Sequence, residues 1–481
     1  MQSGTTDLHR DAYVDGAWVS GARRFPVEDP FDGAVIAEVT AADEDLVDTA
    51  VAAASRAFLA WRQTPAPARG RLLGQLAARM LADEDRLAAL CVRENGKPTR
   101  EALAEVRYAA SFLTWFAAEA ERIYGETIPS AHPGQRITVI REPVGPCALI
   151  TPWNFPYAML TRKLGPALAA GCTVVAKPAV QTPLSALALA DLAHQVGIPP
   201  GVINVITTDE ASRIGGRLLA APAIRKISFT GSTGIGKKIL RDAAEDLKRV
   251  SLELGGNAPF VVLADADLGA AVDGAMVAKF RNTGQSCVAA NRFIVEAPVA
   301  EAFTARFVTR IAALTVGRGS DAGVDLGPLI DDAAVTKVRR LVDDALARGA
   351  RLVHGAPPTG EGRVVSPIVL TGVTPEMALW RDEIFGPVVA IRTAADEADA
   401  LAQANDTEYG LVAYVYTRDG SRRTRFAEGL EAGMVGIDEG LVSTAQAPFG
   451  GVKHSGLGRE GSRHGLDDYT NLKYIATRIS G

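Results

Sequence analysis

The chain has 481 residues and a net charge of −5, and this acidic balance argues against a nucleic-acid-binding surface, which is strongly basic. Hydrophobic residues make up 47% and charged residues 22%, as in an ordinary globular protein with two or three domains. The amino-terminal stretch has no apolar signal core and no apolar run reaches about 18 residues. We therefore expect no membrane span and a cytoplasmic location.

Periodic apolar residues predict helices at the start of the chain. Between residues 43 and 92 they recur at three- and four-residue steps, with a break at "TPAPARG". A further helix is expected over 102–124, which contains "YAASFLTWFAAEAERIYG". These segments precede the part of the chain where the pattern changes.

Short apolar runs then alternate with helical stretches, which predicts right-handed crossovers and a parallel sheet covered by helices. The runs are "CALIT", "TVVAK", "GVINVIT", "KISFTG" and "RVSLELG". A second α/β series begins near Asn257. The expected fold is a Rossmann-like cofactor domain, a second α/β catalytic domain and a small β arm for oligomerisation. Their expected ranges are 1–127 with 146–256, then 257–445, and 128–145 with 466–481.

The stretch "FTGSTGIGKK" at 229–238 falls one residue short of the P-loop pattern of nucleoside triphosphatases. Lys238 stands where that pattern needs a magnesium-binding hydroxyl, and the dinucleotide pattern G-x-G-x-x-G is absent. The stretch follows a predicted strand and begins a predicted helix. Its free N–H groups and the positive helix end are therefore suited to holding a phosphate.

Cys287 is the candidate nucleophile among four cysteines. It lies in "FRNTGQSCVAANR", a polar loop rich in donors, which favours the thiolate. Cys91 and Cys172 lie in apolar runs and Cys147 begins a strand, so we expect them to be inert. No C-x-x-C pair or zinc spacing is present, and no metal is expected. A structural cysteine is the alternative for Cys287.

A carboxylate and an amide are the other candidate catalytic groups. Glu253 ends an apolar strand in "SLELGGN", where a charge is costly unless it is paired or used. Asn154 follows strand "CALIT" in "TPWNFP", at a strand end where ligands bind, and its amide is suited to an oxyanion. A strand-end ion pair for Glu253 and a turn role for Asn154 are the alternatives.

Taken in order, seven motifs resemble the NAD(P)-dependent aldehyde dehydrogenase superfamily over nearly the whole chain. They are "TPWNFP", "GCTVVAKP", "FTGST", "LELGGNAP", "NTGQSC", "EIFGPV" and "PFGGVKHSGLGREG". The nearest branch is that of succinate-semialdehyde dehydrogenases. The resemblance implies that Cys287 attacks the aldehyde, that Asn154 and a backbone N–H hold the alkoxide, and that Glu253 activates water to release the acid.

The resemblance also implies how the other ligands bind. A carboxylate at the far end of the aldehyde, as in succinate semialdehyde, is expected at Arg162, Arg281 and Ser443. Glutarate semialdehyde, one methylene longer, is the competitor. Self-association as a dimer or tetramer is implied as well. The residues expected at the cofactor are Trp153, Lys177, Val180, Gly231, Ser232, Glu383 and Phe385.

Val180 bears on whether the cofactor is NADP or NAD. Family members that prefer NAD often have glutamate here, and its charge repels the 2′-phosphate of NADP. Valine removes that repulsion while Lys177 offers a positive charge, so NADP is favoured. Gln181 and Thr182 are possible further contacts.

Two positions depart from the family pattern. Ala289 replaces a second cysteine found two residues after the nucleophile in many relatives, so no reversible disulfide is expected there. Asp438 replaces the asparagine of a "G-[IV]-N" motif, with no evident consequence. A CoA-acylating relative is disfavoured by Glu253, and a catalytically silent binding protein is disfavoured by the retained site residues.

Overall fold

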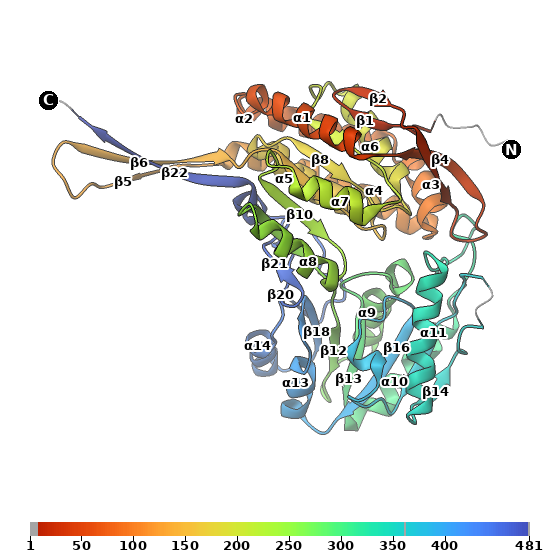
Figure 1. Ribbon diagram of the computed structural model, residues 1–481. Helices are drawn as coiled ribbons and strands as arrows, with labels where there is room; N and C mark the ends of the chain where they lie inside the picture. The colour runs from red at the N-terminus through yellow and green to blue at the C-terminus, as the bar shows by residue number, and fades with distance from the viewer. Residues whose placement is uncertain (1–7, 360–361, 480–481) are drawn as a thin grey trace.

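The computed structural model describes residues 8–359 and 362–479; the first seven residues of the predicted cofactor domain, residues 360–361 of the predicted catalytic domain and the last two of the predicted arm lie outside the described residues. Two lobes lie one above the other, and a long β arm projects from one side (Figure 1). The predicted α/β class with Rossmann-like parallel strands is confirmed.

The first lobe is built on an eight-stranded sheet in the order β2-β1-β9-β8-β7-β10-β11-β21. Its five inner strands are parallel, but β1 pairs antiparallel with β9 and β21 pairs antiparallel with β11, so the predicted parallel sheet has antiparallel edges. The strands are Ala12–Val14, Ala17–Val19, Cys147–Ile150, Val174–Lys177, Ile203–Val205, Lys226–Thr230, Arg249–Glu253 and Gly456–Leu457 for β1, β2, β7, β8, β9, β10, β11 and β21.

Helices α1 to α8 surround this sheet, some packed on it and others on neighbouring helices (Figure 1). Asp43 caps the first of them by accepting from the Leu46 N–H, and Gly171, at φ 96°, ends α5 in the left-handed conformation that glycine allows. Fully buried Trp61, Phe112 and Phe116 belong to the core beneath them. The helices α1 to α8 are Glu44–Trp61, Ala66–Ala82, Glu84–Asn95, Thr99–Glu119, Pro156–Ala170, Pro183–Gln195, Ala211–Ala220 and Thr233–Ala244.

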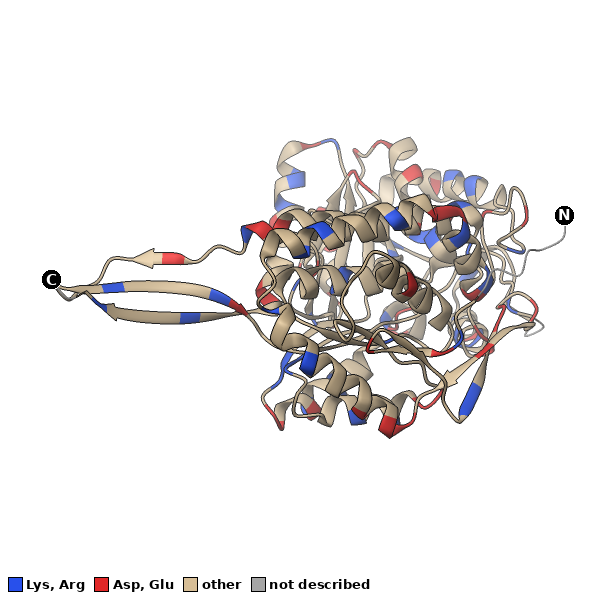
Figure 2. Ribbon diagram, turned by 90° about the horizontal axis from the view of Figure 1, so that it is seen from above, with Lys and Arg blue, Asp and Glu red and all other residues tan. Residues whose placement is uncertain are grey.

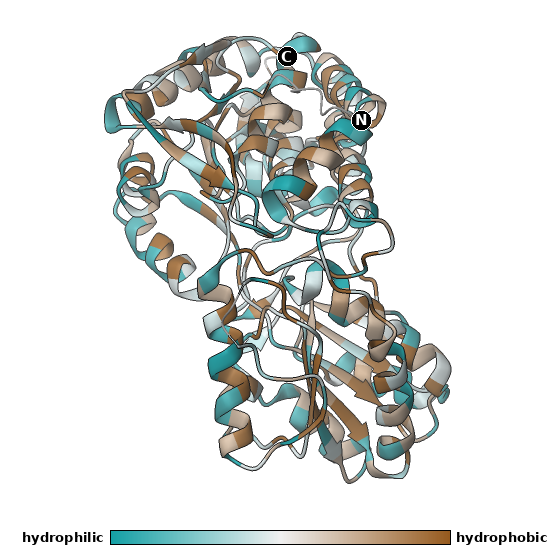
Figure 3. Ribbon diagram, turned by 90° about the vertical axis from the view of Figure 1, so that its right-hand side faces the viewer, coloured by the Kyte–Doolittle hydropathy of each residue, from teal (hydrophilic) through white to brown (hydrophobic). Residues whose placement is uncertain are grey.

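The second lobe has a seven-stranded sheet in the order β14-β15-β16-β13-β12-β18-β19. Only the edge strand β14 is antiparallel to its neighbour. The inner strands are buried on both faces, as parallel strands covered by helices must be (Figure 3). The strands β12 to β16, β18 and β19 are Ala258–Val262, Ala290–Glu296, Arg351–His354, Ile368–Thr371, Val388–Ala394, Val412–Tyr416 and Met434–Ile437. The helices α9 to α14 are Leu268–Phe280, Ala300–Ala312, Asp332–Ala347, Ala378–Arg381, Glu397–Asn405 and Gly420–Gly429.

The arm is a three-stranded antiparallel sheet of β5 (Glu126–Ile128), β6 (Gln135–Pro143) and β22 (Thr470–Arg478). Strands β6 and β22 pair over nine residues each, so segments more than 300 positions apart lie side by side. The helix expected to reach residue 124 stops earlier, because α4 ends at Glu119 and a 3-10 turn, Ala120–Arg122, leads into β5.

Two short strand pairs complete the sheets: β3 (Arg23–Glu28) pairs with β4 (Val35–Ala41), and β17 (Tyr409–Gly410) pairs with β20 (Val452–Lys453). The remaining 3-10 turns are Arg281–Gly284, Ala297–Val299 and Arg463–Tyr469. Lysines and arginines alternate with acidic residues over the surface (Figure 2). None of the helices within the described residues is both long and apolar enough to span a membrane.

Candidate active site

A cavity of about 350 Å³ lies between the lobes, where the carboxyl ends of first-lobe strands face the loop before β13. Asn154 and Cys287 line it from opposite lobes, and Thr230 and Gly231 contribute the end of β10. Ligands of open α/β sheets bind outside the carboxyl ends of strands, so the position fits a binding site. The other lining residues are Pro152, Trp153, Ser232, Leu254, Gly255, Ile330, Asp331, Ala333, Ala334, Lys337, Glu383 and Phe385.

The loop that carries Cys287 is tightly constrained. Asn282 and Thr283 have φ of 52° and 57°, and Gly284 follows at φ 76°. A left-handed conformation is costly for threonine, so the surrounding contacts must hold it. The Asn282 N–H donates to the Glu101 carboxylate at 2.6 Å. A side chain at Gly256 would place its Cβ 2.3 Å from the Cys287 carbonyl oxygen, so only glycine allows this close approach.

The Cys287 thiol does not have the lowered pKa that its polar sequence neighbours predict. Burial raises the pKa of Cys287, and the nearby Glu253 carboxylate adds to the rise because it repels a thiolate. Arg162 opposes both effects only in part. The sequence indicated the polarity of the loop but not the depth of the site, and the thiol is protonated at neutral pH in this arrangement.

Asn154 is buried beside the nucleophile, and hydrogen bonds fix the position of its backbone. Its carbonyl oxygen accepts from the Lys97 ammonium at 2.8 Å and from the Asn282 side chain at 2.9 Å. The Asn154 side-chain N–H₂ donates to the Gln285 carbonyl at 3.2 Å, which ties the amide to the Cys287 loop. An amide held this way is preorganised for an oxyanion that forms on a carbonyl oxygen when the sulfur attacks the carbon.

Glu253 ends β11 and is buried, but it faces Arg162 and is not among the residues that line the cavity. The Arg162 Nη2 lies 4.0 Å from its carboxylate, and neither carboxylate oxygen has a hydrogen-bond partner in the described structure. Burial raises the pKa of Glu253 to about 8, while Arg162 limits the rise. This value suits a general base that works near neutral pH.

Arg162 is engaged with a second carboxylate that the sequence reasoning missed. Its Nε lies 2.9 Å from Glu460, and its guanidinium lies 3.9 Å from the centre of the Phe449 ring. Glu460 also pairs with Lys163, whose ammonium donates to the Thr230 hydroxyl at 2.7 Å. Burial raises the pKa of Glu460, but the two cations outweigh it and the net shift is downward.

Arg281 has a different setting from Arg162. It is half-buried, its guanidinium lies 4.8 Å from the Phe155 ring centre and 5.7 Å from that of Tyr108, and it forms no ion pair with the described residues. Ser443 is half-buried and lies beside Tyr108. Of the two predicted substrate arginines, Arg162 is thus ion-paired, whereas Arg281 forms no ion pair with the described residues. Their role at a substrate stays a prediction.

Several predicted cofactor residues surround the cavity. Trp153 and Phe385 meet edge to face with ring centres 5.5 Å apart, and Phe385 has φ 59°. The Glu383 carboxylate accepts from the Gly256 N–H at 3.0 Å, and burial raises its pKa. Ser232 is the residue before α8 and makes no side-chain cap, so the first N–H groups of that helix are open to an anion.

Lys177 and Val180 lie outside the main cavity. Lys177 is buried at the end of β8, its ammonium has only the Pro178 carbonyl as a partner, at 3.3 Å, and burial lowers its pKa to about 8. A buried ammonium with no acidic partner among the described residues is suited to the polar groups of a nucleotide. Val180 packs against the core and borders a cavity of about 120 Å³.

The structure gives the contacts of the two residues that follow Val180. Gln181 donates from its side chain to Asp331 of the second lobe at 3.3 Å, so its amide already has a partner. Thr182 is buried, with its hydroxyl unpaired in the described structure. Gln181 therefore links the lobes at the rim of the site.

Lys337 lines the cavity and was not predicted. It lies on α11, a surface helix rich in charges, where one lysine gives no sequence signal. Asp438 is explained by the fold: it has φ 53°, its carboxylate accepts from the Thr417 N–H at 3.1 Å and pairs with Arg423 at 2.6 Å. Aspartate tolerates this conformation better than most residues, and its charge is neutralised locally.

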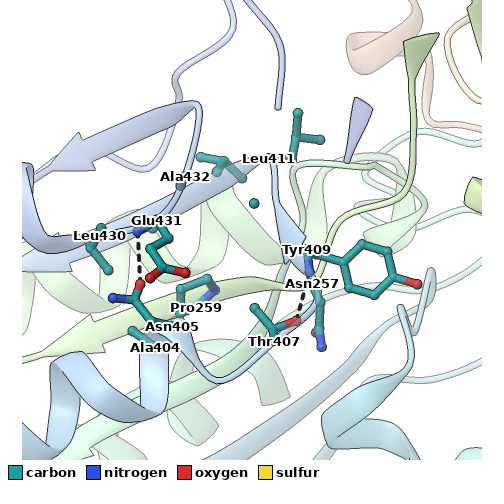
Figure 4. A pocket seen from close by; sticks show the side chains of 13 residues that line it. Asn257, Pro259, Ala404, Asn405, Thr407, Tyr409, Leu411, Leu430, Glu431 and Ala432 are labelled. Carbon is teal, nitrogen blue, oxygen red and sulfur yellow. Dashed lines mark hydrogen bonds between the residues drawn. The ribbon is translucent and has the colours of Figure 1, made fainter. Parts of the chain in front are cut away.

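A smaller cavity in the second lobe lies beside Asn257, Asn405 and Tyr409 (Figure 4). Its volume of about 10 Å³ is room for about one water molecule, so it is no substrate site. The Asn405 side chain accepts from the Glu431 N–H at 2.9 Å across it, which indicates a structural role.

Comparison with known proteins adds the family context. The model of the aldehyde dehydrogenase family matches residues 18–475. A glutarate-semialdehyde dehydrogenase of Pseudomonas aeruginosa is 50% identical over 97% of each chain. An NADP-dependent succinate-semialdehyde dehydrogenase of Escherichia coli is 48% identical over 99% of each. The crystal structure of an NADP-dependent enzyme of E. coli superposes with a TM-score of 0.97 at 48% identity, over 98% of each chain.

Proposed function

We propose that this chain, which belongs to the aldehyde dehydrogenase family, oxidises an aldehyde that carries a carboxylate at its far end, with succinate semialdehyde as the first candidate. The observation that carries the proposal is Arg281, a half-buried guanidinium that lies six residues before Cys287 in the chain and forms no ion pair among the described residues. A charged, aromatic-flanked donor of this kind is suited to a carboxylate, while a neutral aldehyde leaves it unpaired.

The reaction follows from the residues around Cys287. The thiol loses its proton and the thiolate attacks the aldehyde carbon, forming a C–S bond and an alkoxide. The Asn154 amide and the Cys287 backbone N–H hold that alkoxide. Trp153, Glu383 and Phe385 would hold the nicotinamide, which would supply the acceptor for the hydride that leaves this carbon, so that an acyl thioester remains on the sulfur. Glu253 then removes a proton from water, which attacks the thioester and releases the acid and the thiol.

Glutarate semialdehyde is the second candidate. It is favoured by the Pseudomonas relative, which is 50% identical and whose name specifies that substrate. One methylene is worth only ~1–3 kcal/mol in an apolar pocket, so the two aldehydes differ by a modest factor for a site with fixed charges.

For the cofactor, the family's enzymes use NAD or NADP, and we propose a preference for NADP. The residues proposed to hold it are Trp153 and Phe385, the open N–H groups at Ser232, the Glu383 carboxylate and the Lys177 ammonium. Val180 supports the preference because it places no carboxylate beside the ribose, and Lys177 has no acidic partner among the described residues. The E. coli relative named for NADP agrees with this reading.

A panel of aldehydes followed at 340 nm tests the proposal. Succinate semialdehyde, glutarate semialdehyde and butanal are compared with NADP and with NAD, each with and without coenzyme A. We expect the two semialdehydes to exceed butanal in kcat/KM by at least ~10-fold, with no dependence on coenzyme A. Butanal turnover equal to that of both semialdehydes would remove the distal carboxylate from the proposal.

A further inference from the structure

Tyr108 has a hydroxyl with an unusual setting. The residue lies on α4 and its ring is half-buried, but the oxygen is closed off from solvent; it has no well-aligned hydrogen-bond partner in the described structure, and the Ser443 hydroxyl is the one side chain close enough to share a hydrogen bond with it. Buried hydroxyls nearly always have a partner, because an unmade hydrogen bond is costly. A buried phenol whose hydrogen-bonding neighbour is a second hydroxyl lacks an acceptor for one of the two protons, which indicates a donor whose acceptor arrives with a ligand.

The groups around Tyr108 come from three other parts of the chain. The Arg281 guanidinium lies 5.7 Å from the centre of its ring. Burial raises the pKa of Tyr108, while Arg162 and Arg281 lower it and Cys287 raises it, so all three act on the phenol at short range. Ser443 is its neighbour from the loop after β19. The hydroxyl therefore lies among the nucleophile and both arginines.

The side chains around Tyr108 supply hydrogen-bond donors without a matching acceptor. Arg281 has only donors, and none of them is used by a described residue. The Tyr108 hydroxyl and the Ser443 hydroxyl add two more donors. Of the nearby carboxylates, Glu253 and Glu460 face Arg162. Glu101 lies close enough to act electrostatically on Arg281, but its carboxylate accepts from the Asn282 N–H and forms no ion pair with Arg281. What the group lacks is an acceptor, and a carboxylate oxygen supplies one for each donor.

We propose that the Tyr108 hydroxyl donates a hydrogen bond to the distal carboxylate of the substrate, beside Arg281, and so acts as a specificity-determining residue. This inference rests on the proposed function, because it names a further contact of the same substrate group. The hydroxyl remains protonated throughout and takes no part in bond making. Its contribution is to the binding of anionic aldehydes over neutral ones.

The test is Tyr108→Phe, which removes one oxygen atom and leaves the ring in place. kcat/KM is measured for succinate semialdehyde and for butanal. A hydrogen bond to a charged group is worth enough for a ~10- to 100-fold effect, so the ratio of the two efficiencies should fall by that factor. The butanal efficiency should stay within about twofold of the wild type.

Tyr124→Phe is the matched control, since Tyr124 is 69% exposed on the surface. It should leave the ratio unchanged. Thermal unfolding of both variants checks that the fold is retained, and the Tyr108→Phe, Arg281→Ala double variant adds a second readout. If both groups bind one carboxylate, the double variant loses less than the product of the single losses.

Each result of the Tyr108→Phe experiment either supports or overturns the proposal. An unchanged ratio in Tyr108→Phe, or an equal fall for both aldehydes, overturns the proposal and assigns Tyr108 a structural role. A wild type that does not prefer succinate semialdehyde over butanal overturns the proposed function as well. A fall in the ratio alone, with the butanal efficiency kept, supports it. The failure of Tyr108 is thus distinguishable from the failure of the substrate assignment.

Discussion

Glu253 is the residue whose environment bears most directly on turnover. It is buried with both carboxylate oxygens unpaired in the described structure, and its pKa is raised to about 8. A base must be ionised to take a proton from water, so hydrolysis of the thioester should speed up as pH rises through about 8.

The raised pKa of Glu253 also makes its ionisation in the folded state costly. Because the folded pKa lies above the unfolded one, the stability tied to the protonated carboxyl is lost as pH rises toward 8.

Glu253→Gln separates the two half-reactions. The variant should form the thioester, release one equivalent of reduced cofactor and then stall, because the amide cannot act as a base. Stopped-flow absorbance at 340 nm measures the burst and the steady rate. Cys287→Ala is the control, since it should show neither phase. Steady turnover by Glu253→Gln near the wild-type rate would remove the glutamate from the mechanism.

Val180 allows a second single-residue test, of cofactor choice. Val180→Glu places a carboxylate where we propose that the ribose lies, and like charge disfavours a 2′-phosphate. The ratio of kcat/KM for NADP to that for NAD should fall by at least ~10-fold, or about 1.4 kcal/mol. Val180→Gln controls for size without charge. A wild type that already favours NAD by more than ~10-fold would contradict the preference.

Arg162 shows where sequence reasoning reached its limit. Its place on the helix after Asn154 was evident, but its ion pair with Glu460 joins residues nearly 300 positions apart. No local pattern indicates such a contact. The same holds for the thiol of Cys287: its loop composition predicted a lowered pKa, whereas the enclosure of the site raises it.

The junction of α4, α5 and the Asn154 loop depends on one buried ion pair. Lys97 and Glu105 are both fully enclosed; Lys97 also donates to the Asn154 carbonyl, and Glu105 accepts from the Tyr157 N–H at the start of α5. Lys97→Met leaves the Glu105 charge unpaired, so the free energy of unfolding should fall by about 3–5 kcal/mol.

Urea unfolding of Lys97→Met measures that loss. The double variant Lys97→Met, Glu105→Gln is the control, because removing both charges should restore part of the stability. A loss below about 1 kcal/mol in the single variant would show that the pair does not hold the junction. The variant should also lower kcat, since the Asn154 backbone carbonyl loses one of its two side-chain donors.

At the level of strands and helices, the repeated βα units were predictable because parallel strands are apolar throughout and helices repeat every 3.6 residues. The short antiparallel pieces were not. Strands β1 and β2 have three residues each, and β17 and β20 have two, too few to show an alternating pattern. Their positions depend on tertiary contacts such as Tyr13 against Val205.

The arm is the feature of the whole molecule that points beyond one chain. It projects away from both lobes, and Leu472 and Tyr474 on β22 are 65% and 61% exposed (Figure 1). Exposed apolar side chains on a paired strand suit contact with a second copy of the chain, as the sequence predicts. The double variant Leu472→Glu, Tyr474→Glu should shift the sedimentation coefficient toward the monomer.

Asn471→Glu is the control for the arm, because alternate residues of a strand face opposite sides. It should leave the sedimentation coefficient unchanged. A double variant that sediments as the wild type would exclude this face of β22 from self-association. The sedimentation coefficient of the wild type distinguishes a dimer from a tetramer.

The substrate assignment is tested most directly at Arg281. The ratio of kcat/KM for succinate semialdehyde to that for butanal is measured in the wild type, in Arg281→Ala and in the surface control Arg100→Ala, whose side chain is 63% exposed. We predict a fall of at least ~10-fold in Arg281→Ala, since a charge-assisted contact to the distal carboxylate is lost, and no change in the control. A ratio that is the same in all three proteins would contradict the account.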